Sequence, residues 1–268
     1  MDNLKQLARD IRRETFEMAM KAGRGHLGGS LSCVEILLSL YAGGILRHDP
    51  RNPGWPERDR FILSKGHANN SLFVVLAKMG YFPESELEGF LTNGSRLGMH
   101  LDRRLPGVET VSGSLGHGLG LASGMAKAAK LDGTGQRFFV LMGDGESQEG
   151  SVWEAGMFAA QHKLDNLIAI TDRNRLGSED FTENTAGLQP IEARWEAFGF
   201  EVRSVDGHDF QAIHAALADL GQRRNGKPLM LVANTTKGKG ISVLENLPHS
   251  HHTLPRGEEI EIARKELQ

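Results

Sequence analysis

The clearest indication of the fold is the segment Phe138-Phe139-Val140-Leu141-Met142-Gly143-Asp144-Gly145. Its first five residues are apolar, as expected of a strand that is buried on both faces of a sheet. A second apolar run at 167–170 is followed by Asp172-Arg173-Asn174, and a helix-like segment at about 149–163 lies between the two runs. This order predicts a strand–helix–strand unit. It places Asp144 and Asn174 at the carboxyl ends of two parallel strands, where open α/β sheets bind ligands.

The Asp144 and Asn174 side chains predict a particular ligand. Carboxylate and amide oxygens beside glycines suit a Mg²⁺ ion that carries a diphosphate. The alternative is that Gly143-Asp144-Gly145 is only a turn, since Asp and Gly both favour turns. The Asn at the end of the next strand favours the metal site.

Polar clusters follow each predicted strand along the chain. The strands are expected at 60–63, 138–142, 167–170, 200–205 and 229–233, and the clusters at 64–67, 143–145, 172–174, 206–208 and 235–240. If the sheet is parallel, all the clusters meet at one edge and form a ligand site. We therefore predict an α/β fold, mainly a parallel sheet with helices on both faces. Without an internal repeat or a linker, residues 1–268 are expected to form a single domain.

Helical patterns occupy much of the remaining chain. Apolar spacing predicts an amphipathic helix at the start. Ser32 and Glu35 have the spacing of a capping box before a second helix. Further helices are expected at about 68–79, 116–130 and 210–220, after a cap at Ser85, and from Pro255 onwards. The charged segment 49–59 is expected to be a solvated connection.

Composition excludes several classes of function. A net charge of −3 provides no basic surface for nucleic acid. No apolar run approaches the roughly 18 residues that span a membrane. The single cysteine, Cys33, rules out an intrachain disulfide framework and is expected to be a buried thiol in a reducing compartment. The predicted location is cytoplasmic.

Histidines stand beside glycines at several turns. They indicate proton handling or polar substrate contacts, although a lone histidine is more often structural. His249, His251 and His252 resemble a zinc cluster, but no cysteine or carboxylate set lies nearby at ligand spacing. The spacing therefore disfavours the zinc interpretation. Lys237 could belong to a solvated loop or could face phosphate.

Several segments together resemble one known family. They are AGRGHLGGS at 22–30, SKGH at 64–67, GSLG at 113–116, GDGESQEG at 143–150 and KGKG at 237–240. The chain is similar to the N-terminal part of transketolase over about residues 8–252. The resemblance implies the thiamine diphosphate-binding fold and the transfer of a two-carbon ketol unit from a ketose to an aldose, as in the pentose phosphate pathway.

The resemblance also implies roles for individual residues. The cofactors would be thiamine diphosphate and Mg²⁺, with Ca²⁺ or Mn²⁺ as substitutes. The metal ligands would be Asp144, Asn174 and the backbone carbonyl of Leu176. The catalytic histidines would be His26, His67, His100 and His251, and Glu149 and Glu154 would join an acidic network that links paired active sites. The remaining cofactor contacts would come from Gly113, Ser114, Leu115, Gly143, Gly145, Glu146 and Lys237, together with His67 and His251.

Some positions depart from the usual transketolase pattern. They are Leu27, Leu101, His117 and His252, and they lie near the expected substrate entrance, so they bear on sugar specificity. The pyrimidine-binding and third domains of a full transketolase are not in this sequence. The resemblance therefore implies a split enzyme of α2β2 assembly, in which the partner is a separate C-terminal chain and the substrates are sugars or sugar phosphates.

Two other functions share the metal motif. One is the α-subunit of a thiamine diphosphate-dependent 2-oxo acid dehydrogenase, and the other is a non-catalytic thiamine diphosphate-binding module. The segment 64–67 and His26 are not expected in this form in the dehydrogenase class. They favour transketolase.

Overall fold

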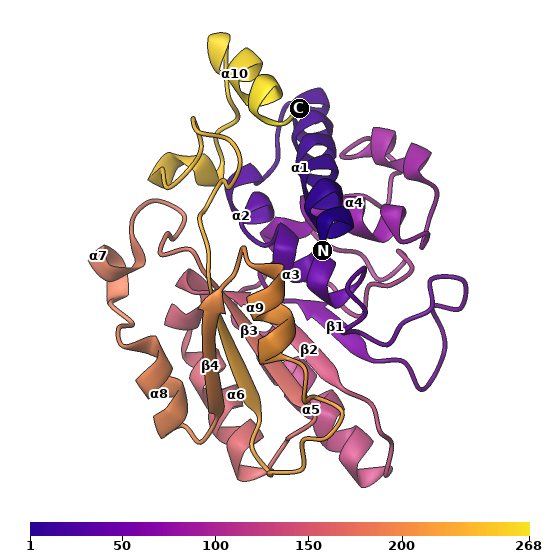
Figure 1. The fold of residues 1–268 in the computed structure, drawn as a ribbon, viewed down its shortest axis with the longest axis vertical. Helices are drawn as coiled ribbons and strands as arrows, with labels where there is room; N and C mark the ends of the chain where they lie inside the picture. Colours follow the sequence, from indigo (N-terminus) through magenta and orange to yellow (C-terminus); the bar gives the residue numbers. More distant parts are fainter.

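The computed structural model describes residues 1–268, with the exception of the side chain of His249. Five parallel strands form the sheet in the order β1-β2-β3-β5-β4 (Figure 1). All five predicted strands are confirmed, at β1 (Arg60–Leu63), β2 (Phe138–Gly143), β3 (Leu167–Arg173), β4 (Glu201–Asp206) and β5 (Leu229–Asn234). Because every neighbouring pair is parallel, the carboxyl ends of the strands meet at one edge.

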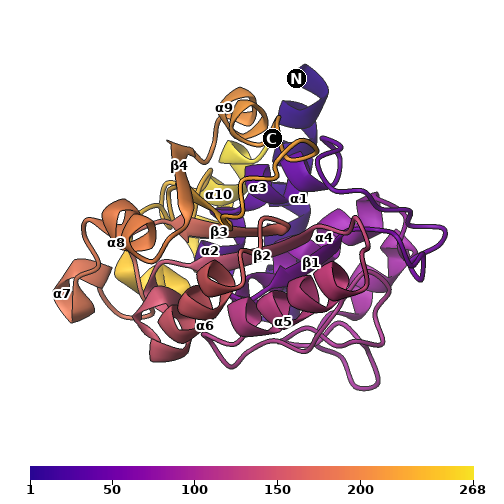
Figure 2. The same ribbon diagram turned by 90° about the horizontal axis from the view of Figure 1, so that it is seen from below.

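Helices cover both faces of this sheet (Figure 2). Two short helices, α7 and α8, follow β3 and were not predicted from the sequence. The α-helices are α1 (Asp2–Ala22), α2 (Leu27–Leu31), α3 (Val34–Leu40), α4 (Asn69–Lys78), α5 (Gly118–Leu131), α6 (Gly150–Gln161), α7 (Thr182–Ala186), α8 (Ile191–Ala197), α9 (Phe210–Ala216) and α10 (Glu258–Glu266). Single 3-10 turns are η1 (Gly66–Ala68), η2 (Glu84–Gly89), η3 (Gly145–Gln148) and η4 (Pro248–His251). None of the described helices is both long and apolar enough to cross a membrane.

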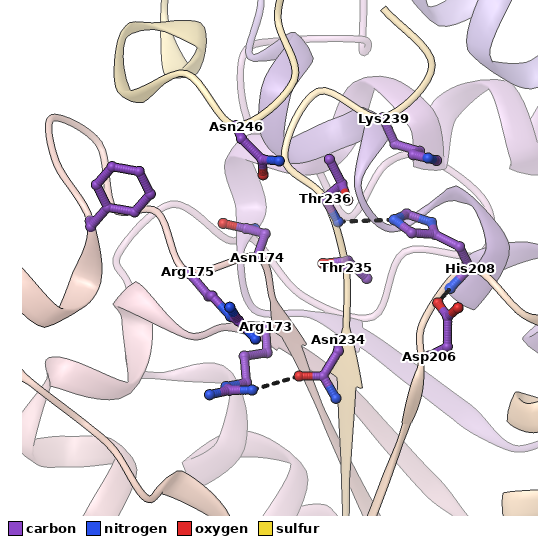
Figure 3. Close-up of a pocket in the computed structure, with 11 residues that line it drawn as sticks. Arg173, Asn174, Arg175, Asp206, His208, Asn234, Thr235, Thr236, Lys239 and Asn246 are labelled. Atoms are coloured by element: carbon purple, nitrogen blue, oxygen red, sulfur yellow. Dashed lines mark hydrogen bonds between the residues drawn. The ribbon is translucent and has the colours of Figure 1, made fainter. Parts of the chain in front are cut away.

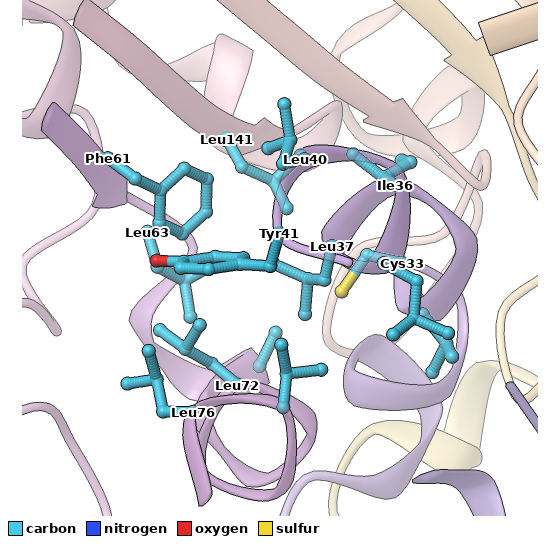
Figure 4. Close-up of a cluster of buried hydrophobic side chains, with 14 of the residues drawn as sticks. Cys33, Ile36, Leu37, Leu40, Tyr41, Phe61, Leu63, Leu72, Leu76 and Leu141 are labelled. Carbon is cyan, nitrogen blue, oxygen red and sulfur yellow. The ribbon is translucent and has the colours of Figure 1, made fainter. Parts of the chain in front are cut away.

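Alternate residues of each central strand enter two different cores. In β2, Phe139 and Leu141 join the core that includes α3, α4 and α9, whereas Val140 and Met142 join the core beneath α5, α6 and α8. This alternation follows from the two-residue period of a strand. Figure 4 shows part of the first core, in which Tyr41 lies against Phe61. Because helices cover both faces of the sheet, a ligand can reach the sheet only at the ends of its strands.

The predicted capping box is not formed. Helix α3 begins after Cys33 without a side-chain cap. The Ser32 hydroxyl instead donates to Asp172 Oδ2 at 2.6 Å, and Glu35 accepts two hydrogen bonds of 2.7 Å from Arg12. Both side chains are buried. In a buried position a hydrogen bond to a charged group is stronger than the hydrogen bonds of a helix cap. Cys33 is buried, as predicted.

The segment 49–59 is not wholly solvated, because Asp59 is 1% exposed. The Asp59 carboxylate accepts hydrogen bonds from Arg47 Nε at 3.1 Å and from Arg137 Nε at 3.0 Å. Burial opposes ionisation of Asp59, but these two arginines lower its pKa. The two guanidinium groups offset the cost of burying the negatively charged Asp59 carboxylate.

Candidate functional site

A cavity of about 160 Å³ lies at the carboxyl edge of the sheet. Its walls come from the polar clusters after β1, β2, β3 and β5, as the sequence predicted. Ten of the predicted site residues line it: His67, Leu115, Gly143, Asp144, Gly145, Glu146, Asn174, Leu176, Lys237 and His251. The cluster at 206–208 lies elsewhere and lines a different hollow.

Asp144, Asn174 and Leu176 bring oxygen donors to this cavity. Asp144 Oδ1 accepts the N–H of Gly145 at 2.8 Å, and Asn174 Oδ1 accepts the N–H of Leu176 at 3.1 Å. Burial, followed by the charge of Asp172, raises the pKa of Asp144 to about 6. A divalent cation would relieve this unfavourable concentration of negative charge. The residues present therefore fit a Mg²⁺ ion.

Lys65 and Asp172 form an ion pair beneath the cavity. Burial alone would lower the pKa of Lys65 and raise that of Asp172, but their mutual attraction shifts both pKa values the other way. Asn174 Nδ2 donates to Asp172 Oδ2 at 3.3 Å, so the pair also positions the amide that faces the cavity. Lys65 and Asp172 belong to the clusters that were predicted to meet at this edge, but neither was assigned a role of its own. No local signal could have shown that they pair, because they lie 107 residues apart.

Glu146 joins the loops that follow β1 and β2. Its carboxylate accepts the N–H of Gly116 at 2.9 Å and that of Gly143 at 3.1 Å, and the Ser64 hydroxyl also donates to it. Burial raises the pKa of Glu146. Glu146 lines the cavity, and its hydrogen bonds show that it also holds the surrounding backbone.

Lys237 supplies a buried cation to the same cavity. Its Nζ donates to the carbonyl of Gly177. Burial, followed by the charge of Lys65, lowers the pKa of Lys237 to about 8. A cation that is costly to bury favours an anionic ligand beside it.

Four histidine rings gather at one end of the cavity. The centroid of His26 lies 5.6 Å from His67, 5.3 Å from His251 and 5.3 Å from His252. Burial is the main cause that lowers the pKa of His26 to about 4 and that of His251 to about 3, and it lowers the pKa of His67 as well. These three rings are therefore neutral near pH 7 and can both donate and accept a proton.

The other predicted residues do not line this cavity. Gly113 has a φ of 142°, and a Cβ there would lie 3.0 Å from the His100 ring, so the glycine permits this contact. Ser114 is exposed, with its hydroxyl 3.4 Å from His117 Nδ1. Glu149 and Glu154 are exposed on the α6 segment, away from the cavity.

A larger hollow of about 800 Å³ adjoins the site and shares Asn174 with it (Figure 3). Its charged residues include Arg173 and Arg175. Arg173 Nη1 donates to Asn234 Oδ1 at 2.6 Å, and the N–H of Thr236 donates to His208 Nε2 at 2.9 Å. The smaller cavity, which holds the buried carboxylate and cations, is the better candidate for a specific ligand.

Comparisons with known proteins agree on one family. The family model described as transketolase, thiamine diphosphate binding domain, matches residues 4–268. The chain is 45% identical over 269 residues to an apulose-4-phosphate transketolase subunit of Actinobacillus succinogenes, covering 100% of this chain and 96% of that protein. It is also 45% identical over 251 residues to the 6-deoxy-6-sulfo-D-fructose transketolase subunit SqwG of a Clostridium species, covering 93% and 90% of the two chains.

Solved structures show the same fold. The transketolase of Campylobacter jejuni superposes with a TM-score of 0.91 at 35% identity, covering 100% of this chain and 43% of the other. The transketolase of Leishmania mexicana gives a TM-score of 0.91 at 29% identity, covering 98% and 41%. The chain thus spans about two fifths of these transketolase chains, and nearly the whole of the subunits above.

Proposed function

The chain belongs to the transketolase family, as its thiamine diphosphate-binding domain, and from that premise we propose how its cavity works. The diphosphate group of the cofactor occupies the 160 Å³ cavity, with Mg²⁺ held by Asp144, Asn174 and the carbonyl of Leu176. The main support for this proposal is that these oxygen ligands and the Lys237 ammonium group line one buried cavity. In this proposal residues 1–268 act as a single domain.

The protein residues around the cofactor have separate tasks. When bound, thiamine diphosphate supplies the electron sink for breaking and forming a carbon–carbon bond beside a carbonyl. Lys237 balances the charge of the diphosphate, while the backbone at Gly143 and Gly145 allows its close approach. His67 and His251 contact the same group as neutral hydrogen-bonding rings. Gly113, Ser114 and Leu115 contact the cofactor from the loop before α5.

His26 and His100 face the sugar in this proposal. The pKa of His26, about 4, keeps its ring neutral, so its unprotonated nitrogen can accept a hydrogen bond from a sugar hydroxyl. The close approach of Gly113 to the His100 ring supports a position for the second ring beside the loop proposed to contact the cofactor. The two imidazoles therefore orient the ketose and move protons on its hydroxyl groups.

The chain is proposed to act with a second, different chain. Support comes from the similar proteins of matching length, which are named as transketolase subunits. The partner would supply the pyrimidine-binding domain, and the assembly would be α2β2. Leu121, Met157 and Phe158 expose apolar side chains on α5 and α6, and with Glu149 and Glu154 they offer a face for a second copy.

The substrates are proposed to be ketoses with an anionic group. The two relatives act, by their names, on apulose 4-phosphate and 6-deoxy-6-sulfo-D-fructose, which carry a phosphate and a sulfonate. An aldose would accept the two-carbon unit. A place in the pentose phosphate pathway and a cytoplasmic location stay predictions.

Calorimetric titration with thiamine diphosphate, with and without Mg²⁺, tests the cofactor site. Asp144→Ala is expected to abolish the Mg²⁺-dependent part of the affinity, whereas Asp132→Ala, at an exposed position after α5, serves as the matched control. Unchanged Mg²⁺-dependent affinity in Asp144→Ala would refute the metal assignment.

Co-purification from native lysate, followed by an assay of ketol transfer, tests the activity. We expect a second chain to co-elute with thiamine diphosphate-dependent transfer. Cofactor binding without a partner or transfer would favour a non-catalytic binding module.

A further inference from the structure

Three histidines from distant parts of the sequence come together at the cavity entrance. His26 precedes α2, whereas His251 and His252 lie at and after η4. One ring nitrogen from each lies within 4.8 Å of the other two. The sequence suggested His249 with His251 and His252 as a cluster, but the side chain of His249 lies outside the described residues. The structure instead adds His26.

Two ring nitrogens of these histidines lack a hydrogen-bond partner. Nδ1 of His26 and Nδ1 of His251 are buried, and neither has a hydrogen-bond partner in the described part of the chain. A buried polar atom without a partner is costly, and such an atom at a cavity calls for an explanation. Burial lowers the pKa of both rings, so each ring is neutral near pH 7 and keeps one nitrogen lone pair for a metal ion. His252 is exposed, so an ion can reach the cluster from solvent.

Three imidazoles make a recognised ligand set. Catalytic and exchangeable zinc sites use three protein ligands and leave a fourth position to water, with Zn–N bonds of about 2.0–2.1 Å. Tetrahedral geometry with such bonds needs nitrogens about 3.4 Å apart, so ring movements of about 1 Å would close the cluster. The set contains no oxygen ligand, and it therefore disfavours Mg²⁺ and favours a zinc-class ion.

We propose that His26, His251 and His252 bind one zinc-class divalent cation at the entrance, apart from the oxygen ligands of Asp144 and Asn174. The ion would be held by His26, the residue assigned to the sugar, and so would oppose sugar binding. This consequence rests on the proposed function, whereas the ion site itself does not. The cluster would then make the site reversibly sensitive to zinc.

Titration of the full chain with Zn²⁺, in excess Mg²⁺ to occupy the oxygen site, tests the proposal by calorimetry. Wild type is expected to bind one Zn²⁺ ion. His252→Gly should weaken this binding by about 100-fold or more, since changing even a residue that only supports a metal ligand costs about 10–100-fold. His252→Gln, which keeps a side chain of similar length, should weaken it equally. His162→Ala, an exposed histidine after α6, should bind as wild type does.

Cobalt provides an independent readout of the ligand set. Co²⁺ should give the visible absorption of a tetrahedral site in wild type and His162→Ala, and lose it in both His252 variants. Equal Zn²⁺ binding by wild type and both His252 variants, or no binding by wild type, would overturn the proposal. His252-dependent binding together with no ketol transfer by the complex purified with its partner chain would leave the ion site standing and refute the proposed function instead.

Discussion

Lys65 and Asp172 form an ion pair across the sheet, with side chains that are 1% and 0% exposed. Lys65 follows β1 and Asp172 lies in β3, so the pair passes over the end of β2. Ser32 and Asn174 bind the same carboxylate oxygen, at 2.6 Å and 3.3 Å. The pair thereby connects the segment after α2 to the predicted metal ligand.

Removing one member of this pair should be strongly destabilising. Lys65→Met leaves Asp172 buried without its cation, and such changes cost about 3–5 kcal/mol. Denaturant unfolding should show this loss, and Lys265→Met, at an exposed position in α10, should show almost none. The double variant with Asp172→Leu should recover part of the loss, since no charge then remains buried. A loss below about 1 kcal/mol in Lys65→Met would contradict this account.

Cofactor affinity should depend on pH through Lys237. Its pKa of about 8 means that the ammonium group is present below pH 8 and is lost as the pH rises above it. Thiamine diphosphate affinity should therefore fall above pH 8, by up to about tenfold for each pH unit. Lys237→Arg should hold its affinity to higher pH, because arginine stays charged. Calorimetry from pH 7 to 9 makes the comparison, and equal slopes for the two proteins would argue against a diphosphate contact.

Stability in acid should depend on Glu35. Burial would raise its pKa, but His208 and Arg12 lower it to about 2. Its stabilising contribution is therefore complete above the unfolded pKa of 4.5 and is lost as the pH falls toward 2. The shift corresponds to about 3 kcal/mol.

Urea unfolding of Glu35→Gln measures this contribution. The stability difference from wild type should be largest near pH 6 and should shrink below about pH 4.5. Glu258→Gln, at an exposed position in α10, should show no such trend. A difference that is constant with pH would mean that ionised Glu35 contributes nothing.

If His26 contacts the sugar, replacing it should lower kcat more than the affinity for thiamine diphosphate. His26→Ala is expected to lower kcat by about 100-fold or more, in the range of lost general acid–base catalysis, while thiamine diphosphate affinity changes little. Steady-state kinetics of the purified complex and calorimetry of the same variant separate the two quantities. His208→Ala, outside the cavity but also partly buried, is the control for a general effect of losing a histidine. The reverse pattern would place His26 at the cofactor.

The sequence predicted correctly where Asp144 and Asn174 lie in the fold, whereas their role as metal ligands stays a prediction. Asp144 and Asn174 each follow a buried strand, and parallel pairing of β2 with β3 brings them to one cavity. The apolar runs could be recognised because a strand buried on both faces must be apolar throughout. Helices α7 and α8 were missed because both are shorter than a typical helix, and their patterns are correspondingly weak.

Sequence reasoning was wrong where a charged partner lies far away along the chain. Ser32 has the spacing of a helix cap, yet it binds Asp172, 140 residues later. Asp59 stands among polar residues that suggest a solvated segment, yet it is held by Arg137, 78 residues later. Burial strengthens such charged contacts beyond the local preference.

The strands and the polar residues at their ends could be read from the amino-acid sequence, because they depend on periodicity and on turn residues close by. Which of those polar residues contact one another could be read only from the folded chain. The strand order β1-β2-β3-β5-β4 sets Lys65 against Asp172, and the packing of the segment around η4 against α2 sets His26 beside His251. Contacts of this kind depend on the path of the whole chain, and a local sequence pattern contains no information about that path.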